Sequence, residues 1–191
     1  MENLHKEMKK CTQCRLRKTC TQVVPGEGPA DAHIVILGEG PGQNEDEEGR
    51  PFVGRAGQFL RSQLRGIEKH GVYISNTVRC RPPDNRDPNP DETEACWPWT
   101  LKTLQVIKPK VVVTLGKPAL NTIAFKYGIK IPAGGFAEKT AGKRIYVEER
   151  KFFLFPCVHP AFALRRKEAR KQFTTHMKYL GRALPGWLRR P

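Results

Sequence analysis

The loop over residues 38–57 combines chemistry-bearing side chains with glycines, directly after an apolar run. Its sequence is GEGPGQNEDEEGRPFVGRAG. A glycine-rich turn in that position commonly binds phosphate. Five carboxylates precede Arg50, the first basic residue of this loop: Glu39, Glu45, Asp46, Glu47 and Glu48. They would repel an anionic ligand, although the whole chain carries a formal charge of +15. This contrast indicates that a polyanion is held outside the site and a neutral or cationic group is handled inside it.

An amide and an imidazole occupy equivalent places elsewhere in the chain. Asn76 follows the apolar run 72–75, and His159 follows the run 152–158. In open α/β sheets the ligand lies beyond the carboxyl ends of the strands. We therefore expect Asn76 and His159 to converge with the loop 38–57 on one crevice.

Four of the six cysteines have the placement of a metal or cluster site. Cys11 and Cys14 form a C-x2-C pair, and Cys80 and Cys96 follow with fifteen residues between them. The number of ligands does not separate zinc from an iron–sulfur cluster. A simpler reading, in which Cys80 and Cys96 are only buried packing residues, also stays open. The other two cysteines follow no pairing rule and are expected to be packing residues: Cys20 and Cys157.

A strand–helix alternation must position these groups. Short apolar runs of the kind found in strands covered on both faces occupy 33–37, 72–75, 111–115 and 152–158. Helical patterns occupy 56–69, 91–107, a segment from Lys117 onward, and 167–184. A glycine-rich turn and a short hairpin ending at Val147 are expected within 132–150. The alternation predicts a single α/β domain over residues 1–191, a three-layer α/β/α sandwich with a mostly parallel, four-stranded central sheet.

Composition narrows the class of partner. With 34 Lys and Arg against 19 Asp and Glu, and a pI near 9.8, nucleic acid is the leading partner class, and a basic protein that binds none is the alternative. No apolar run has transmembrane length, and the first residues lack the apolar core of a signal peptide. We therefore expect a cytoplasmic monomer without membrane contact.

Four motifs, in order along the chain, resemble those of the family 4 uracil-DNA glycosylases, the iron–sulfur type. They are GEGPGQNED, GRPFVGRAG, YISNTVRCRPPDNRDP and HPAFALR. The resemblance extends from Cys11 to about Arg166. It implies that the chain flips uracil out of DNA, hydrolyses the N1–C1′ glycosidic bond and leaves an abasic site.

The resemblance also implies roles for the base pocket. Phe52 matches the aromatic residue that stacks on uracil, and Asn76 matches the residue that reads its Watson–Crick edge. Glu39 and Gly40 match the pocket wall. His159 matches the residue beside uracil O2, where negative charge develops as the base leaves.

A catalytic carboxylate and a DNA-contacting segment follow from the same resemblance. Glu45 is the candidate carboxylate, which could orient a water, stabilise an oxocarbenium-like sugar or block the methyl group of thymine. The segment after His159 matches the loop that enters DNA, with Leu164 as the wedge and Arg165 and Arg166 on phosphates.

By resemblance again, Cys11, Cys14, Cys80 and Cys96 bind a [4Fe–4S] cluster with a structural role. The cluster-binding N-terminal segment would span about 8–20. Some related glycosylases form a covalent adduct through a His before the last cluster cysteine. The segment 80–96 contains no His, so we expect turnover.

The basic tail, about 185–191, could be disordered, could contact DNA, or could dock on a DNA-replication or repair protein. Two alternatives to the enzyme remain at this point. One is a non-enzymatic nucleic-acid-binding module stabilised by a metal or cluster, and the other is a small-molecule-binding α/β protein.

Overall fold

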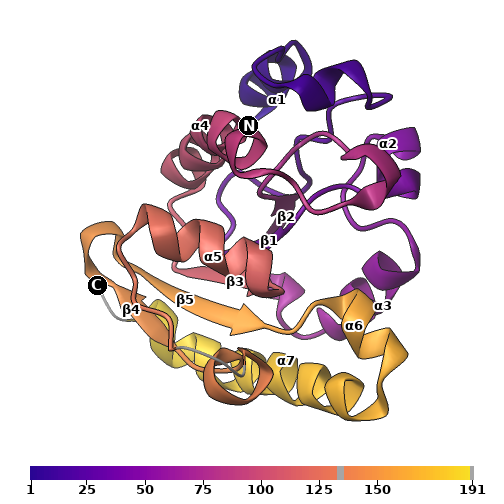
Figure 1. The fold of residues 1–191 in the computed structure, drawn as a ribbon. Coiled ribbons are helices and arrows are strands. Elements are labelled where there is room, and N and C mark those ends of the chain that lie inside the picture. Colours follow the sequence, from indigo (N-terminus) through magenta and orange to yellow (C-terminus); the bar gives the residue numbers. More distant parts are fainter. Residues whose placement is uncertain (133–135, 190–191) are drawn as a thin grey trace.

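The computed structural model describes residues 1–132 and 136–189, in which five strands form one sheet in the order β2-β1-β3-β5-β4 (Figure 1). The strands are β1 (Ile34–Gly38), β2 (Val72–Asn76), β3 (Val111–Leu115), β4 (Ile145–Val147) and β5 (Phe152–Cys157). Neighbouring strands among β2, β1, β3 and β5 are parallel, and β4 pairs antiparallel with β5. The α/β class and the mostly parallel sheet are confirmed.

The structure adds a fifth strand to the four that were predicted. β4 has three residues and pairs with β5 from Ile145 opposite Leu154 to Val147 opposite Phe152. The hairpin ending at Val147 is therefore an edge of the sheet. Three residues are too few for an alternating pattern to stand out in the sequence. The glycine-rich turn expected next to it falls partly on 133–135, outside the described residues.

The helices follow the predicted alternation. They are α1 (Glu2–Lys9), α2 (Gln43–Glu48), α3 (Arg55–Gln63), α4 (Pro90–Ile107), α5 (Lys117–Lys126), α6 (Pro160–Arg165) and α7 (Lys167–Leu188). Single turns of 3-10 helix occupy Arg15–Lys18, Glu68–His70, Pro83–Asn85 and Glu148–Arg150, and a π turn occupies Phe136–Thr140. The predicted helix 56–69 ends early, at Gln63, and a separate turn follows it. Three helices were not predicted: α1, α2 and α6.

Two apolar layers cover the sheet. Along β1, Ile34 and Ile36 face one layer while Val35 and Leu37 face the other. The first layer contains residues of α3 and α7, and the second contains residues of α4 and α5 (Figure 1). Because every residue of β1 is buried, its sequence is apolar throughout and does not alternate. The three-layer sandwich is confirmed.

A third apolar cluster lies under the N-terminal segment. Leu4 and Met8 of α1 and Leu16 of the following turn pack with Cys80 and Trp99. This cluster joins the first twenty residues to α4 and to the chain that follows β2. The C-x2-C pair therefore lies beside the two distant cysteines.

The C-terminal helix extends beyond its predicted end. α7 continues to Leu188, and Trp187 is buried with its ring 5.4 Å from that of Phe153 and 5.8 Å from that of Phe155. Residues 185–188 thus belong to the core helix, which excludes a disordered start for the tail; the last two residues lie outside the described part. None of the described helices combines the length and apolar character needed to span a membrane.

Candidate active site

A cavity of about 450 Å³ lies beyond the carboxyl ends of β1, β2 and β5. It collects residues from four separate parts of the sequence, as expected for parallel strands that end at the same edge. The predicted residues that line it are Glu39, Gly40, Glu45, Phe52, Asn76, His159 and Arg165. The predicted convergence of the loop, the amide and the imidazole is therefore found in the structure.

Asn76 lies at the end of β2, directly opposite Gly38 at the end of β1. It is 2% exposed, and within the described residues its Oδ1 atom has no hydrogen-bond partner. A Cβ atom on Gly38 would lie 2.4 Å from Asn76 Oδ1 and 2.5 Å from Phe52 Cζ. Gly38 therefore makes room for both side chains. Sequence reasoning assigned it only to the turn.

Phe52 has a backbone φ of +55°, which is unfavourable for a residue with a side chain. Contacts on both sides hold this conformation. Glu45 Oε1 accepts hydrogen bonds from the N–H groups of Val53 (2.8 Å) and Gly54 (2.9 Å). Arg61 donates from Nε to the carbonyl of Phe52 (3.1 Å) and from Nη2 to that of Pro51 (2.9 Å). One carboxylate and one guanidinium thus clamp the Phe52 loop.

Further residues hold Arg61 and the Phe52 loop in place. Glu27 forms ion pairs with both Arg61 and Arg50, with an N–O distance of 3.1 Å in each pair. Gly57 of α3 lies against the loop so closely that a Cβ atom there would be 2.0 Å from the backbone of Phe52. Sequence reasoning singled out Glu45 but missed Arg61, because the pairing of a helix residue with carbonyls nine and ten positions earlier leaves no local pattern.

His159 serves as the N-cap of α6. Its Nδ1 atom accepts a hydrogen bond from the N–H of Ala161 (3.2 Å), so the proton of a neutral ring is on Nε2. Burial, and then the nearby Arg165, lower the pKa of His159 to about 4, whereas Glu45 acts in the opposite direction. The ring centre lies 6.2 Å from that of Phe52. The site therefore contains a neutral N–H donor at physiological pH.

Glu39 is paired with a second carboxyl group that was not predicted. Burial, followed by the charge of Asp87 and a hydrogen bond to it, raises the pKa of Glu39 to about 7. Asp87 belongs to a loop that lines the pocket together with Asn85 and Arg86. The NRDP sequence of this loop entered the family motif, but nothing in its local pattern predicted contact with Glu39.

The three residues expected to contact DNA lie on and after α6. Arg165 lines the cavity, while Leu164 is 37% exposed and Arg166 is exposed. The guanidinium of Arg166 lies 5.4 Å from the ring centre of Phe162, which is also exposed. Two exposed apolar side chains and two exposed arginines therefore follow His159, and Arg165 reaches the pocket.

The four cysteines predicted to form a metal or cluster site line a second, smaller cavity beside the N-terminal segment: Cys11, Cys14, Cys80 and Cys96. Trp99 Nε1 donates a hydrogen bond to the sulfur of Cys11 (3.2 Å). In the described part of the chain, no group of three or more His, Cys, Asp or Glu side chains is arranged to hold a metal ion.

The two cysteines predicted to be packing residues have different surroundings. Cys157 is fully buried in the main core, as expected for a packing residue. Cys20 is also buried, but it packs in the same apolar cluster as Cys80 and contacts it, which lowers the pKa of Cys20 to about 7.

A buried arginine, Arg79, also lines the cysteine cavity. It donates from Nη1 to the backbone carbonyl of Asn76 and to Thr100 Oγ1 (2.9 Å). Arg79 therefore connects the cysteine cavity to the end of β2.

Comparison with known proteins agrees with this geometry. Residues 25–181 match the family model described as the uracil DNA glycosylase superfamily. The chain therefore belongs to this superfamily of α/β proteins.

Similar proteins show to which family within the superfamily the chain belongs. The chain is 42% identical over 177 residues to the type-4 uracil-DNA glycosylase of Sulfurisphaera tokodaii (90% of this chain, 79% of the relative). It is 43% identical over 171 residues to that of Thermotoga maritima (87% and 84%) and 37% identical over 185 residues to that of Archaeoglobus fulgidus (95% and 92%). Within the superfamily, the chain is a member of the type-4 uracil-DNA glycosylases.

Proposed function

We propose that this protein removes uracil from DNA by hydrolysing the N1–C1′ bond, which leaves an abasic site. The observation that carries the proposal is the buried amide of Asn76, whose Oδ1 is unpartnered among the described residues, in one cavity with Phe52 and His159. A buried polar atom without a partner is costly unless a ligand satisfies it. Membership of the type-4 family supports uracil in DNA as that ligand.

Base selection follows from the amide. Phe52 offers a ring on which an extruded base can stack. The amide of Asn76 accepts from N3–H of uracil through Oδ1 and donates to O4 through Nδ2. Cytosine presents the opposite polarity at both positions, so its binding leaves buried groups unpaired.

Departure of the base requires stabilisation of negative charge on uracil O2. His159 supplies a donor from Nε2, since its Nδ1 is engaged by Ala161. Its lowered pKa keeps the ring neutral. A preorganised donor of this type stabilises the charge that develops in the transition state.

Glu45 contributes through position and charge. Its two oxygens accept three backbone hydrogen bonds, from Gly42 at 3.1 Å and from the Phe52 loop. The carboxylate thus fixes the stacking ring and adds negative charge beside the pocket, where it stabilises an oxocarbenium-like sugar. The catalytic role expected for Glu45 stays a prediction.

Base extrusion requires contacts on the duplex outside the pocket. Leu164 is assigned as the wedge that fills the space left by the base, and Arg165 and Arg166 as phosphate contacts. Their exposure at the pocket edge supports this assignment. Binding as a monomer, and docking of a repair or replication protein on the C-terminal tail, stay predictions.

The four cavity-lining cysteines are proposed to hold a [4Fe–4S] cluster: Cys11, Cys14, Cys80 and Cys96. Four thiols facing one enclosed space fit the ligand set of such clusters. The cluster supplies a structural crosslink between the N-terminal segment, the chain after β2 and α4. Absorbance near 400 nm and iron and zinc analysis of the purified protein test this assignment; zinc with no visible absorbance would reject it.

The decisive experiment for the activity uses an oligonucleotide with one uracil. The protein should release free uracil and leave an alkali-sensitive site, while the same oligonucleotide with cytosine or thymine stays intact. Tight DNA binding without release of uracil would support the non-enzymatic alternative instead.

A further inference from the structure

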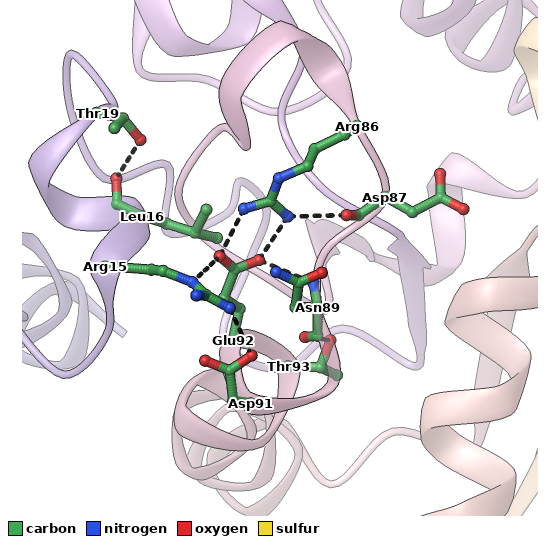
Figure 2. A network of polar contacts seen from close by, with 9 residues as sticks. All are labelled: Arg15, Leu16, Thr19, Arg86, Asp87, Asn89, Asp91, Glu92 and Thr93. Atoms are coloured by element: carbon green, nitrogen blue, oxygen red, sulfur yellow. Dashed lines mark hydrogen bonds and ion pairs between the residues drawn. The ribbon is translucent and has the colours of Figure 1, made fainter.

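Outside the pocket, a buried carboxylate lies in the first turn of α4, that of Glu92. It is fully buried and accepts four hydrogen bonds (Figure 2). Arg86 donates to both of its oxygens, at 2.7 and 2.8 Å. Arg15 Nε adds a bond of 2.8 Å and the N–H of Asn89 another of 2.8 Å. These contacts, those of Arg86 first, lower the pKa of Glu92 to about 2, so the group is ionised at any physiological pH.

The two arginines come from different functional parts of the molecule. Arg15 directly follows Cys14 and begins the turn that completes the cysteine-bearing segment. Arg86 belongs to the loop 82–88, which lines the base pocket. In Figure 2 the two guanidinium groups approach the Glu92 carboxylate from the two segments. One buried carboxylate therefore joins the cysteine site to the pocket edge.

The pocket-edge loop depends on such support. Its residues 83–87 are exposed, and Asp84 and Asn85 both have a φ of +54°. Non-glycine residues hold this conformation only when surrounding contacts determine it. Arg81 Nε donates to Asn85 Oδ1 (2.8 Å), and Arg86 donates to the carbonyl of Asp87 (2.9 Å), the residue paired with Glu39. Loss of the Arg86–Glu92 contact would thus reach the pocket wall.

We propose that Glu92 is a positioning residue that couples the cysteine-bearing segment to the pocket edge, through Arg15 on one side and Arg86 on the other. Order imposed on the Cys11–Cys14 segment then fixes the loop 82–88 in the conformation that receives the flipped base. The inference rests on the proposed function for the identity of the ligand. The coupling itself is a property of this chain and is measurable without substrate.

The test variant is Arg15→Gln, which breaks the cysteine-side contact and leaves the Arg86–Glu92 pair in place. Its matched control is Asp91→Asn, because Arg15 also contacts Asp91 (2.9 Å), an exposed residue with no hydrogen bond to the loop 82–88 among the described residues. Amide hydrogen exchange of residues 84–87, the loop positions that carry a backbone N–H, is compared in wild type and both variants, each with its visible absorbance and iron content recorded. We expect faster exchange in Arg15→Gln alone. Unchanged exchange in that variant would overturn the proposal.

Kinetics supply a second readout. Arg15→Gln should raise KM for uracil-containing DNA by about 2- to 30-fold, the range of measured couplings between sites, with little change in kcat. Asp91→Asn should match wild type. An equal effect of both variants would indicate a general charge effect and would reject coupling through Glu92. If the protein released no uracil at all, the proposed function would fail, whereas the exchange measurement would still decide the coupling.

Discussion

At the scale of single residues, the proposed selectivity for uracil depends on the two polar atoms of the Asn76 amide. Asn76 is fixed by the strand pairing that sets it opposite Gly38, where only a glycine leaves space. The site therefore reads the base with a rigid group, and small chemical changes in that group should have large effects.

The substitution Asn76→Asp should reduce the preference for uracil over cytosine by about 10- to 100-fold, the value of one or two hydrogen bonds to a charged group. A carboxylate has no N–H to donate to uracil O4, and it accepts from the exocyclic amine of cytosine. The ratio of kcat/KM on matched oligonucleotides measures the change. Asn121→Asp, an exposed position on α5, makes the same charge change and should leave the ratio intact. Unaltered selectivity in Asn76→Asp would remove its assigned role.

The imidazole of His159 caps α6, and we propose that it also donates to the leaving base, so the two tasks can be separated. His159→Ala should slow uracil release by about 10²–10³, as loss of an oxyanion donor does. Asp is a good N-cap but has no N–H. His159→Asp should therefore be as slow as His159→Ala while it unfolds at a higher denaturant concentration. Single-turnover rates and urea unfolding check both points, and a fast Asp variant would show that no donor is needed.

The Glu39–Asp87 pair should give stability a pH dependence. The pKa of Glu39 is raised from 4.5 to about 7. The folded state thus binds more protons than the unfolded state between these values, and this group's contribution to stability falls as pH rises through that window. Asp87→Asn should lower the pKa of Glu39, though not to 4.5, because burial is the larger cause. Carbon NMR titration of the Glu39 carboxyl measures the shift. Asp84→Asn, in the same loop, is the control, and an equal shift there would contradict the pairing.

At the scale of elements, short helices and loops position the pocket side chains. α2 contributes the Glu45 carboxylate, α3 contributes Arg61, and together they hold Phe52 in a conformation that its own backbone disfavours. α6 begins at His159 and so fixes the direction of the ring. These contacts hold the ring of Phe52 and the imidazole of His159 in place without a bound base.

The clamp can be tested with Arg61→Gln. The change leaves the carbonyls of Pro51 and Phe52 without their charged donor, which should reduce the free energy of unfolding by about 1–3 kcal/mol. It should also raise KM, because Phe52 loses its fixed position. Arg50→Gln is the matched control, since Arg50 shares Glu27 but, among the described residues, donates to neither of these carbonyls. Equal losses in urea unfolding for both variants would assign the effect to Glu27 instead.

At the scale of the whole molecule, a positive chain surrounds a pocket with acidic walls. The net charge of +15 attracts the DNA backbone, while the neutral His159 and the partly protonated Glu39 border the uncharged base. Affinity and base selection are thus supplied by different groups.

Binding of uracil-free duplex DNA should weaken steeply with salt, because it depends on release of counterions from phosphates. Arg166→Gln should reduce the slope of log K against log salt concentration by about one phosphate contact. Lys6→Gln, on α1 and away from α6 in Figure 1, should leave the slope unchanged. Fluorescence anisotropy over a salt series gives both slopes. A slope near zero in the wild type would contradict DNA binding through phosphates.

The sequence by itself determined the class of fold and the main pocket residues. Apolar runs, helical periods and strand ends are local signals, and they predicted that Asn76, His159 and the loop 38–57 meet at one edge. The family motifs assigned chemistry to them. The same local signals also indicated that the C-x2-C pair belongs with Cys80 and Cys96.

Only the tertiary structure decided which groups hold these residues in place. The contact of Arg15 with Glu92 joins positions 77 residues apart, and those of Arg61 and Asp87 cross between separate elements. The role of Gly38 likewise appears only when β1 and β2 pair. Such contacts depend on how elements pack, and neither residue spacing nor hydrophobic period encodes the packing, so no local pattern could reveal them.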